Sequence, residues 1–135
     1  MSKENGKISV NVVSALIWKG NRFLACRRPL EKLHGGKWEF VGGKTERGET
    51  ETDALIRECR EELAITVRPI EEFLRLEYEY PEIFVKMAVF VTEIVSGEPQ
   101  RLEHDELRWV GIDEMETLDF SDADQAILKK IKETY

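Results

Sequence analysis

The first part of the chain carries two runs of apolar residues of the kind that form β-strands, separated by a polar turn. Residues 8–18 are rich in apolar and β-branched side chains, and residues 22–27 continue the pattern after a turn that contains glycine. Two such runs joined by a short turn predict a β-hairpin. A loop over residues 28–37 and a short strand over 38–41 follow, and the glycine pair at 42–43 is expected to end that strand.

Helical spacing begins after a polar loop over residues 44–49. Thr50 can cap the predicted helix, which runs to about residue 63, and Asp53 stands in a capping-box position. One side of the helix carries apolar residues at every fourth position, namely Leu55, Cys59 and Leu63. The pattern predicts an amphipathic helix that packs on the core through this side.

The second half of the chain returns to strands and ends in a helix. Residues 73–80 and 83–95 predict two long strands around a proline-containing turn, and residues 106–110 predict a short one. Ser121 or Asp122 is expected to cap the last helix. Its apolar positions keep helical spacing at Ala123, Ala126, Ile127 and Ile131. These elements predict an α/β (α+β) fold in which helices cover the faces of a mixed sheet.

Composition and charge fit one compact domain over residues 1–135. A chain of this length with 41% hydrophobic residues can bury a core. The net charge of -7 argues against a broad basic surface for a nucleic-acid polymer or an anionic membrane. No apolar stretch has membrane-spanning length. Cys26 and Cys59 are isolated, as in reduced proteins, which predicts a cytoplasmic location.

Acidic residues crowd another side of the first predicted helix. With a turn of roughly 100° per residue, Glu58, Glu61 and Glu62 fall within one arc of about 100°. Carboxylates this close repel one another unless positive charge lies over them. A hard divalent cation held by oxygen ligands is the usual solution, and a solvated acidic face is the alternative. The pattern favours a metal site on this helix.

The three acids are part of a longer motif. Gly43, Glu49 and the run Arg-Glu-Cys-Arg-Glu-Glu-Leu-Ala-Ile over residues 57–65 resemble the Nudix box, G-x5-E-x7-R-E-U-x-E-E-x-G-U, in which U is a bulky apolar residue. Every charged position of the box is present. Cys59 replaces a larger aliphatic residue, and Ala64 stands where glycine is usual. Ala64 is expected to be strained if its φ is positive.

Segments outside the box are similar to the MutT branch of the family, the nucleoside triphosphate diphosphohydrolases that sanitise nucleotide pools. They are residues 38–44, 78–81, 97–99 and 119–131, together with Trp109. The resemblance implies a Nudix fold, with a mixed sheet sandwiched between helices, and hydrolysis of a nucleoside triphosphate to a monophosphate and pyrophosphate. It also implies Mg²⁺ as cofactor, which Mn²⁺ can replace, because magnesium bridges acidic side chains and phosphate oxygens.

The resemblance assigns roles to single residues of the box and of a later acidic run. The metal ligands would be Glu58, Glu61 and Glu62, with the backbone carbonyl of Gly42. Glu61 and Glu103 are the candidates for the catalytic base, and we favour Glu103 as base or additional metal ligand. For Glu103 the alternative is a solvated acid in an acidic loop.

Basic residues near the box have two expected roles. The helical angle of Arg57 points away from the acidic arc, which favours a salt bridge to Glu49 that orients the catalytic groups. Arg28 and Lys44 match basic positions of the MutT branch and would contact phosphate. A solvated surface charge is the alternative for each of these two residues.

A nucleobase site is expected around Asp124, which aligns with the position that reads the base in the MutT branch, while Phe40 and Tyr80 would flank the base. An ionised aspartate only accepts hydrogen bonds, so it suits a guanine-type base or the amino group of cytosine. The alternatives are an acid at a helix N-terminus and core packing for both aromatics. His34 and His104 lack a second histidine at zinc-ligand spacing and are expected at the surface.

Three functional hypotheses follow. The leading one is a Mg²⁺-dependent pyrophosphohydrolase that acts on oxidised nucleotides such as 8-oxo-dGTP or on pyrimidine triphosphates such as CTP. The second is a Nudix hydrolase of ADP-ribose or another dinucleotide, and the third is a non-catalytic Nudix-fold binding module. Such modules usually lose glutamates of the box, all of which are present here. The sequence leaves a monomer and a homodimer equally open.

Overall fold

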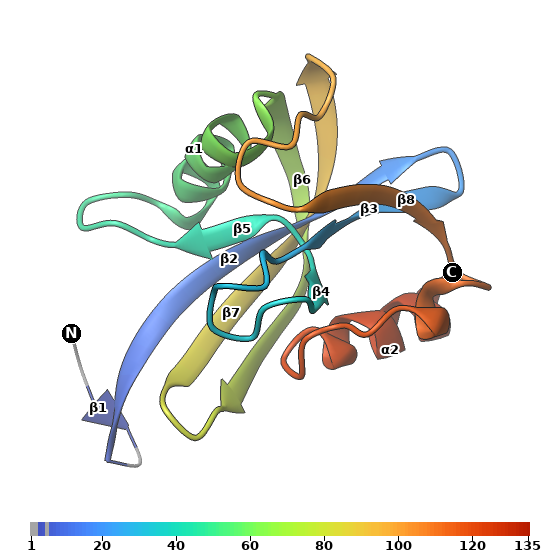
Figure 1. Cartoon of the computed structure of the whole chain (residues 1–135). Helices are drawn as coiled ribbons and strands as arrows, with labels where there is room; N and C mark the ends of the chain where they lie inside the picture. The colour runs from blue at the N-terminus through green and yellow to red at the C-terminus, as the bar shows by residue number, and fades with distance from the viewer. Residues whose placement is uncertain (1–2, 5) are drawn as a thin grey trace.

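The sheet is built around strand β2 (Lys7–Lys19) in the computed structural model, which describes residues 3–4 and 6–135. The other strands are β1 (Lys3–Glu4), β3 (Arg22–Arg27), β4 (Trp38–Glu39), β5 (Gly42–Lys44), β6 (Thr66–Glu79), β7 (Phe84–Ser96) and β8 (Glu106–Gly111). Their order is β4-β3-β2-β7-β6, with β1 and β5 also paired to β2 and β8 paired to β3 (Figure 1). Only β2 and β7 run parallel among the strand pairs of the described residues, so the sheet is mixed.

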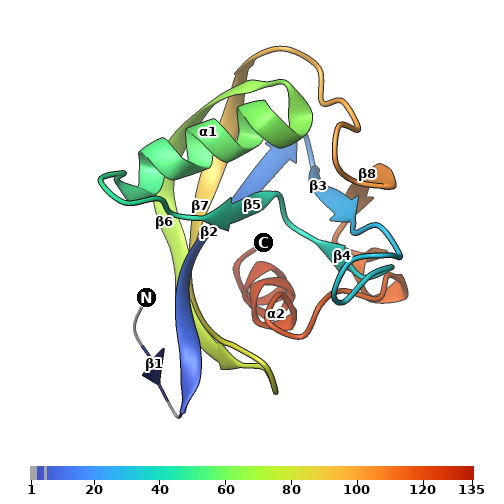
Figure 2. The ribbon, with the colours of Figure 1, turned by 60° about the vertical axis from the view of Figure 1, so that its left-hand side comes forward.

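Helices α1 (Glu51–Leu63) and α2 (Gln125–Thr134) cover opposite faces of the sheet (Figures 1 and 2). Side chains of β2 alternate between the two faces because successive residues of a strand point in opposite directions. Val13 packs in the core cluster that contains α1, whereas Leu16 packs in the cluster that contains α2. A short 3-10 helix (Met115–Thr117) precedes α2. The predicted mixed sheet between helices is confirmed.

The predicted hairpin and the predicted first helix are also confirmed. β2 and β3 pair at Trp18 and Phe23. Thr50 caps α1, and its Oγ1 accepts a hydrogen bond of 3.1 Å from the backbone nitrogen of Asp53. Cys59 is fully buried on the packed side of this helix, as a small hydrophobe. No helix in residues 3–4 and 6–135 is long and apolar enough to cross a membrane.

The prediction that the glycine pair only ends a strand is wrong. β4 ends at Glu39, and Gly42 and Gly43 open the separate strand β5, which pairs with β2 at Val13 and Ser14. A Cβ on Gly42 would lie 1.9 Å from the carbonyl oxygen of Val13. The missing side chain therefore lets the two backbones approach closely.

Two other predicted boundaries are wrong. β6 begins at Thr66, seven residues before the predicted start. Pro69 and the register shifts on either side of it interrupt the regular strand pattern at this end of β6. The last helix begins after Asp124, since the backbone nitrogen of Asp124 donates to the carbonyl of Ser121 at 3.1 Å in a turn. Neither Ser121 nor Asp122 is therefore the N-cap.

The C-terminal end of α1 carries the backbone strain that is expected because Ala64 replaces the usual glycine of the box. Ala64 has a φ of 58° in the left-handed region, and its N–H donates to the carbonyl of Arg60. This conformation costs a residue with a Cβ about 1–2 kcal/mol, which explains why glycine is usual at a helix C-terminus.

Replacing Ala64 with glycine is expected to raise the free energy of unfolding by about 0.5–1 kcal/mol. Relief of the left-handed strain exceeds the extra freedom that glycine gives the unfolded chain. Urea unfolding measures the change. Gly48→Ala is the matched control, because Gly48 has a φ of +85° with open space around its Cβ position, and it should destabilise the protein. A free energy for Ala64→Gly at or below that of the wild type would contradict the expectation.

Candidate active site

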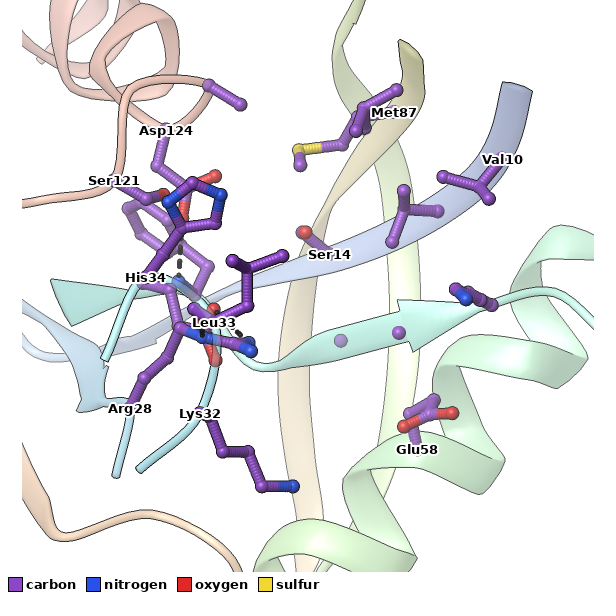
Figure 3. A pocket seen from close by; sticks show the side chains of 18 of the residues that line it. Val10, Ser14, Arg28, Lys32, Leu33, His34, Glu58, Met87, Ser121 and Asp124 are labelled. Atoms are coloured by element: carbon purple, nitrogen blue, oxygen red, sulfur yellow. Dashed lines mark hydrogen bonds and ion pairs between the residues drawn. The ribbon is translucent and has the colours of Figure 1, made fainter. Parts of the chain in front are cut away.

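A cavity of about 370 Å³ lies against β2 and β5. Glu58 of α1 lies at one end, Asp124 lies at the other, and Ser14 of β2 lies between them in the view of Figure 3. The predicted site residues that line the cavity are Arg28, Phe40, Gly42, Lys44, Glu58, Glu62, Tyr80, Glu103 and Asp124. Glu49, Arg57 and Glu61 lie outside the lining. One concave site therefore gathers residues that are far apart in the sequence.

The Glu58 end of the cavity holds the carboxyl groups of two neighbouring acids, Glu58 and Glu62. Glu62 is only 6% exposed. Burial raises the pKa of the Glu62 carboxyl well above its usual range, and the nearby charges of Glu58, Glu39 and Glu103 raise it further. This end of the cavity therefore concentrates acidic groups.

The backbone of β5 forms one wall of this end. A Cβ on Gly43 would lie 2.5–2.6 Å from the carboxyl atoms of Glu58, so the carboxyl group occupies the space that a side chain would fill. Gly42 lies beside it and lines the same cavity. The Gly43 position of the box thus has a steric reason here, because only glycine leaves room for the acid.

The residues at the Glu58 end fit a hard divalent cation. Their donors are carboxylate oxygens and a backbone carbonyl, which Mg²⁺ prefers. A cation would offset the repulsion between Glu58 and Glu62 that helps raise the pKa of Glu62. Within residues 3–4 and 6–135, no three His, Cys, Asp or Glu side chains already converge as a metal-binding group. Glu61, predicted as a third ligand, has a half-exposed side chain outside the cavity lining.

Arg57 connects the loop before α1 to the acids. Its Nε and Nη2 atoms donate to the two oxygens of Glu49 at 2.7 and 3.0 Å, which is the predicted salt bridge. This bidentate hydrogen bond lowers the pKa of Glu49. The prediction that Arg57 points away from the acids is wrong, since its Nη1 lies 2.9 Å from Glu58 and 3.3 Å from Glu61. The helical angle fixes only the Cβ direction, and the long stem lets the guanidinium bend back.

His104 is not at the surface as predicted. Its side chain is 4% exposed, and its Nε2 lies 3.0 Å from Glu39 and 3.6 Å from Glu62. A backbone hydrogen bond from Asp105 to Arg27 draws this loop against β3. The loop is thereby folded into the cavity wall, which residue spacing alone does not reveal.

Glu39 is a cavity-lining residue that sequence reasoning did not select. It accepts hydrogen bonds from His104 and, at 3.2 Å, from Nη1 of Arg28. Arg28, a predicted phosphate contact, is thus paired with an acid and also donates to the carbonyl of Leu33. The available signal was an acid in a short strand directly before the glycine pair. Lys44, the other predicted phosphate contact, lines the cavity from β5.

The Asp124 end of the cavity combines a buried acid with aromatic rings. Oδ2 of Asp124 accepts a hydrogen bond of 3.2 Å from the backbone nitrogen of Phe40. The Tyr80 hydroxyl accepts one of 3.0 Å from the backbone nitrogen of Ala123. Phe40 and Tyr80 both line the cavity and also belong to the core. The centroids of the His34 and Tyr80 rings are 4.8 Å apart. Asp124 makes no side-chain hydrogen bond that caps α2.

Burial raises the pKa of the Asp124 carboxyl to about 7, and the charge of Glu39 adds to this effect. The Phe40 N–H, the Ser121 hydroxyl and the charge of Arg28 act in the opposite direction and do not cancel it. Near neutral pH this acid therefore exists in both protonation states. It can accept from a ligand in one state and also donate to a ligand in the other.

Replacing Asp124 with asparagine is expected to change how stability depends on pH. Because the folded pKa lies above the ordinary value of 3.8, Asp124 lowers stability progressively as pH rises from about 4 through 7. Asparagine keeps an acceptor for Phe40 without this cost. Thermal unfolding from pH 4 to 9 should show Asp124→Asn gaining about 3–6 °C over the wild type at pH 8 relative to pH 4. A difference in Tm that does not vary with pH would refute the expectation.

Comparisons with known proteins identify relatives of the chain. A family model described as a NUDIX domain matches residues 12–130. The 8-oxo-dGTP diphosphatase of Escherichia coli (strain K12) is 32% identical over 84% of this chain and 88% of the relative. The CTP pyrophosphohydrolase of the same organism is 31% identical over 89% of each chain. The crystal structure of MutT protein from Methanosarcina mazei Go1 matches with a TM-score of 0.85 and 25% identity, over 96% of this chain and 97% of that one.

Proposed function

The chain belongs to the Nudix family, and on that premise we propose that it is a Mg²⁺-dependent hydrolase that converts nucleoside triphosphates to monophosphates and pyrophosphate. Its relatives are named as a diphosphatase and a pyrophosphohydrolase, and the chain is accordingly an enzyme that hydrolyses nucleotide pyrophosphate bonds. The observation that carries the proposal is a single cavity with paired acids at one end and a buried aspartate beside aromatic rings at the other.

At the Glu58 end, Glu58 and Glu62 with the carbonyl of Gly42 would hold Mg²⁺, joined by Glu61 after a side-chain rotation. When bound, the ion neutralises phosphate charge and lowers the pKa of a water molecule. The remaining groups of this chain position the reactants. Arg57 holds Glu58 in place through a hydrogen bond of 2.9 Å.

Glu103 lines the cavity close enough to Glu62 to raise its pKa, which supports Glu103 as the base that takes the proton from the attacking water. Glu61 is the alternative base. Lys44 lines the same wall and would contact phosphate oxygens, and Arg28 would do so if it exchanged its contact with Glu39 for one with phosphate.

The nucleobase would occupy the Asp124 end, between Tyr80 and Phe40. Since Asp124 exists in both protonation states near pH 7, it can pair with the N1–H and amino group of a guanine-type base or with cytosine. Oxidised nucleotides such as 8-oxo-dGTP and pyrimidine nucleotides such as CTP are therefore both proposed as substrates, and the relatives support both. Hydrolysis of the former would remove damaged precursors before DNA synthesis. The cytoplasmic location and the choice between monomer and homodimer stay predictions.

A screen for pyrophosphate release tests this function. Wild-type protein with Mg²⁺ or Mn²⁺ would be assayed for pyrophosphate release from normal, oxidised and methylated nucleoside triphosphates. ADP-ribose, whose hydrolysis gives AMP and ribose 5-phosphate and no pyrophosphate, would be assayed by release of AMP. Specificity is read from kcat/KM ratios, because tight binding of the base alone need not accelerate the reaction. We expect metal-dependent pyrophosphate release from at least one triphosphate. Cleavage of ADP-ribose alone would favour the dinucleotide hydrolase, and no turnover of any compound would favour a binding module.

A further inference from the structure

His104 lies inside the wall of the Glu58 end, at a position that the Nudix box does not include. Its Nε2 lies 3.0 Å from Oε2 of Glu39 and 3.6 Å from Oε1 of Glu62. Glu39 belongs to β4, Glu62 belongs to α1, and His104 comes from the loop before β8. One imidazole ring therefore joins three segments that are distant in the sequence.

The surroundings of Nδ1, the other ring nitrogen of His104, indicate which of the two nitrogens carries the proton. Nδ1 of His104 is buried and has no hydrogen-bond partner among residues 3–4 and 6–135. A proton there would be buried without an acceptor, which is costly. A proton on Nε2 instead faces the oxygens of Glu39 and Glu62. His104 accordingly donates through Nε2 to Glu39, within reach of Glu62.

Glu39 is held at both of its oxygens. Nη1 of Arg28 lies 3.2 Å from Oε1, and His104 contacts Oε2. Arg28 is itself fixed by donating from Nε to the carbonyl of Leu33 at 2.9 Å. The Glu39 carboxylate is therefore a well-anchored support for the imidazole ring, whose Nε2 also lies 3.6 Å from Oε1 of Glu62.

We propose that His104 is a positioning residue that sets the orientation of the Glu62 carboxyl group toward the cavity and thereby strengthens binding of a divalent cation there. Its effect on turnover rests on the function proposed above, whereas its effect on cation binding does not depend on the substrate. Groups that orient ligating carboxylates without touching the ion are typically worth about 10- to 100-fold in metal affinity.

Two substitutions at His104 separate the effect of the contact made at the Nε2 position from the effect of losing the volume of the ring. A glutamine side-chain amide reaches the place of the imidazole Nε2, whereas an asparagine amide reaches only the place of Nδ1. The readout is the Mn²⁺ dissociation constant, measured by electron paramagnetic resonance without nucleotide. We expect His104→Asn to weaken Mn²⁺ binding about 10- to 100-fold and His104→Gln to stay within about threefold of the wild type. Circular dichroism and thermal unfolding report whether each variant is folded.

A double-mutant cycle with Glu39→Gln gives a second test. Because His104 is anchored by Glu39, the loss caused by His104→Asn should be smaller in the Glu39→Gln background than in the wild type. Folded variants that both bind Mn²⁺ like the wild type, or that both lose affinity equally, would overturn the proposal. If the wild type hydrolyses no triphosphate while the variants separate as expected, the proposed function fails and the role of His104 in cation binding stands.

Discussion

Replacing Glu62 with glutamine is expected to lower kcat for metal-dependent pyrophosphate release by at least about 10²–10³-fold and, in the absence of metal, to raise Tm. Glutamine has the size of glutamate but carries no charge, so the expected cation would lose a ligand, and with it the charge that neutralises the reacting phosphate would be lost. The same change removes an acid whose burial and acidic neighbours oppose ionisation. Activity and stability should thus move in opposite directions.

The pH dependence of stability distinguishes this explanation from general damage. The folded pKa of Glu62 lies above the ordinary value of 4.5, so its contribution to stability falls as pH rises from about 4.5. In Glu62→Gln that decline should disappear from a series of thermal unfolding curves at pH 4 to 9. Glu61→Gln is the matched control. It should also lower activity as a predicted ligand, but its half-exposed side chain predicts little change in Tm at any pH.

Wild-type activity in folded Glu62→Gln would rule out the role assigned to this acid. A pH dependence of Tm that stays the same in the variant would contradict its buried, proton-holding state. Both measurements use the whole chain, and neither requires the physiological substrate to be known.

Substituting alanine is expected to lower mainly the activity at Gly43 and mainly the stability at Gly42. At Gly43 a Cβ would lie 2.5 Å from the carboxyl carbon of Glu58, and this carboxyl group is the end of a flexible side chain that can move away. Gly43→Ala should therefore cost about 1 kcal/mol or less in stability while lowering activity about 10- to 100-fold, since Glu58 leaves its place in the cavity.

At Gly42 a Cβ would lie 1.9 Å from the carbonyl oxygen of Val13, and backbone cannot move away without breaking the pairing of β5 with β2. Gly42→Ala should destabilise the protein by about 3 kcal/mol or more. Urea unfolding and pyrophosphate release on the same samples separate the two cases. If Gly43→Ala lost stability like Gly42→Ala, or kept full activity, the account of the cavity wall would be wrong.

Local signals in the sequence predicted the parts of the fold that depend on local physics. The apolar period and the Thr50 cap predicted α1, and two apolar runs around a glycine-containing turn predicted the β2–β3 hairpin. The start of β6 was missed because the register shifts around Pro69 interrupt the period of two. β5 was missed because glycines carry no pattern of their own, and its pairing with β2 is a long-range contact.

The candidate site also contains residues that local sequence patterns predicted and contacts that only the tertiary structure reveals. Fixed charge spacing identified Glu58 and Glu62, and the predicted salt bridge between Arg57 and Glu49 is present, although the helical angle of Arg57 misled about its contacts with the acids. The contacts of His104 with Glu39 and Glu62 arise from three distant segments, so no spacing along the chain could predict them. Side-chain length, which the helical angle does not describe, brought Arg57 back to the acids. Sequence reasoning thus found the charges, and the tertiary structure determined how they are paired.

The most direct test of the central claim is a crystal structure of the protein with Mn²⁺ and a non-hydrolysable nucleoside triphosphate, using the anomalous signal of manganese to place the ion. The account predicts manganese within about 2.0–2.4 Å of carboxylate oxygens of Glu58 and Glu62, bridging to the polyphosphate, with the base beside Asp124. An ion that binds elsewhere, or acids that face bulk solvent with no ion beside them, would contradict it.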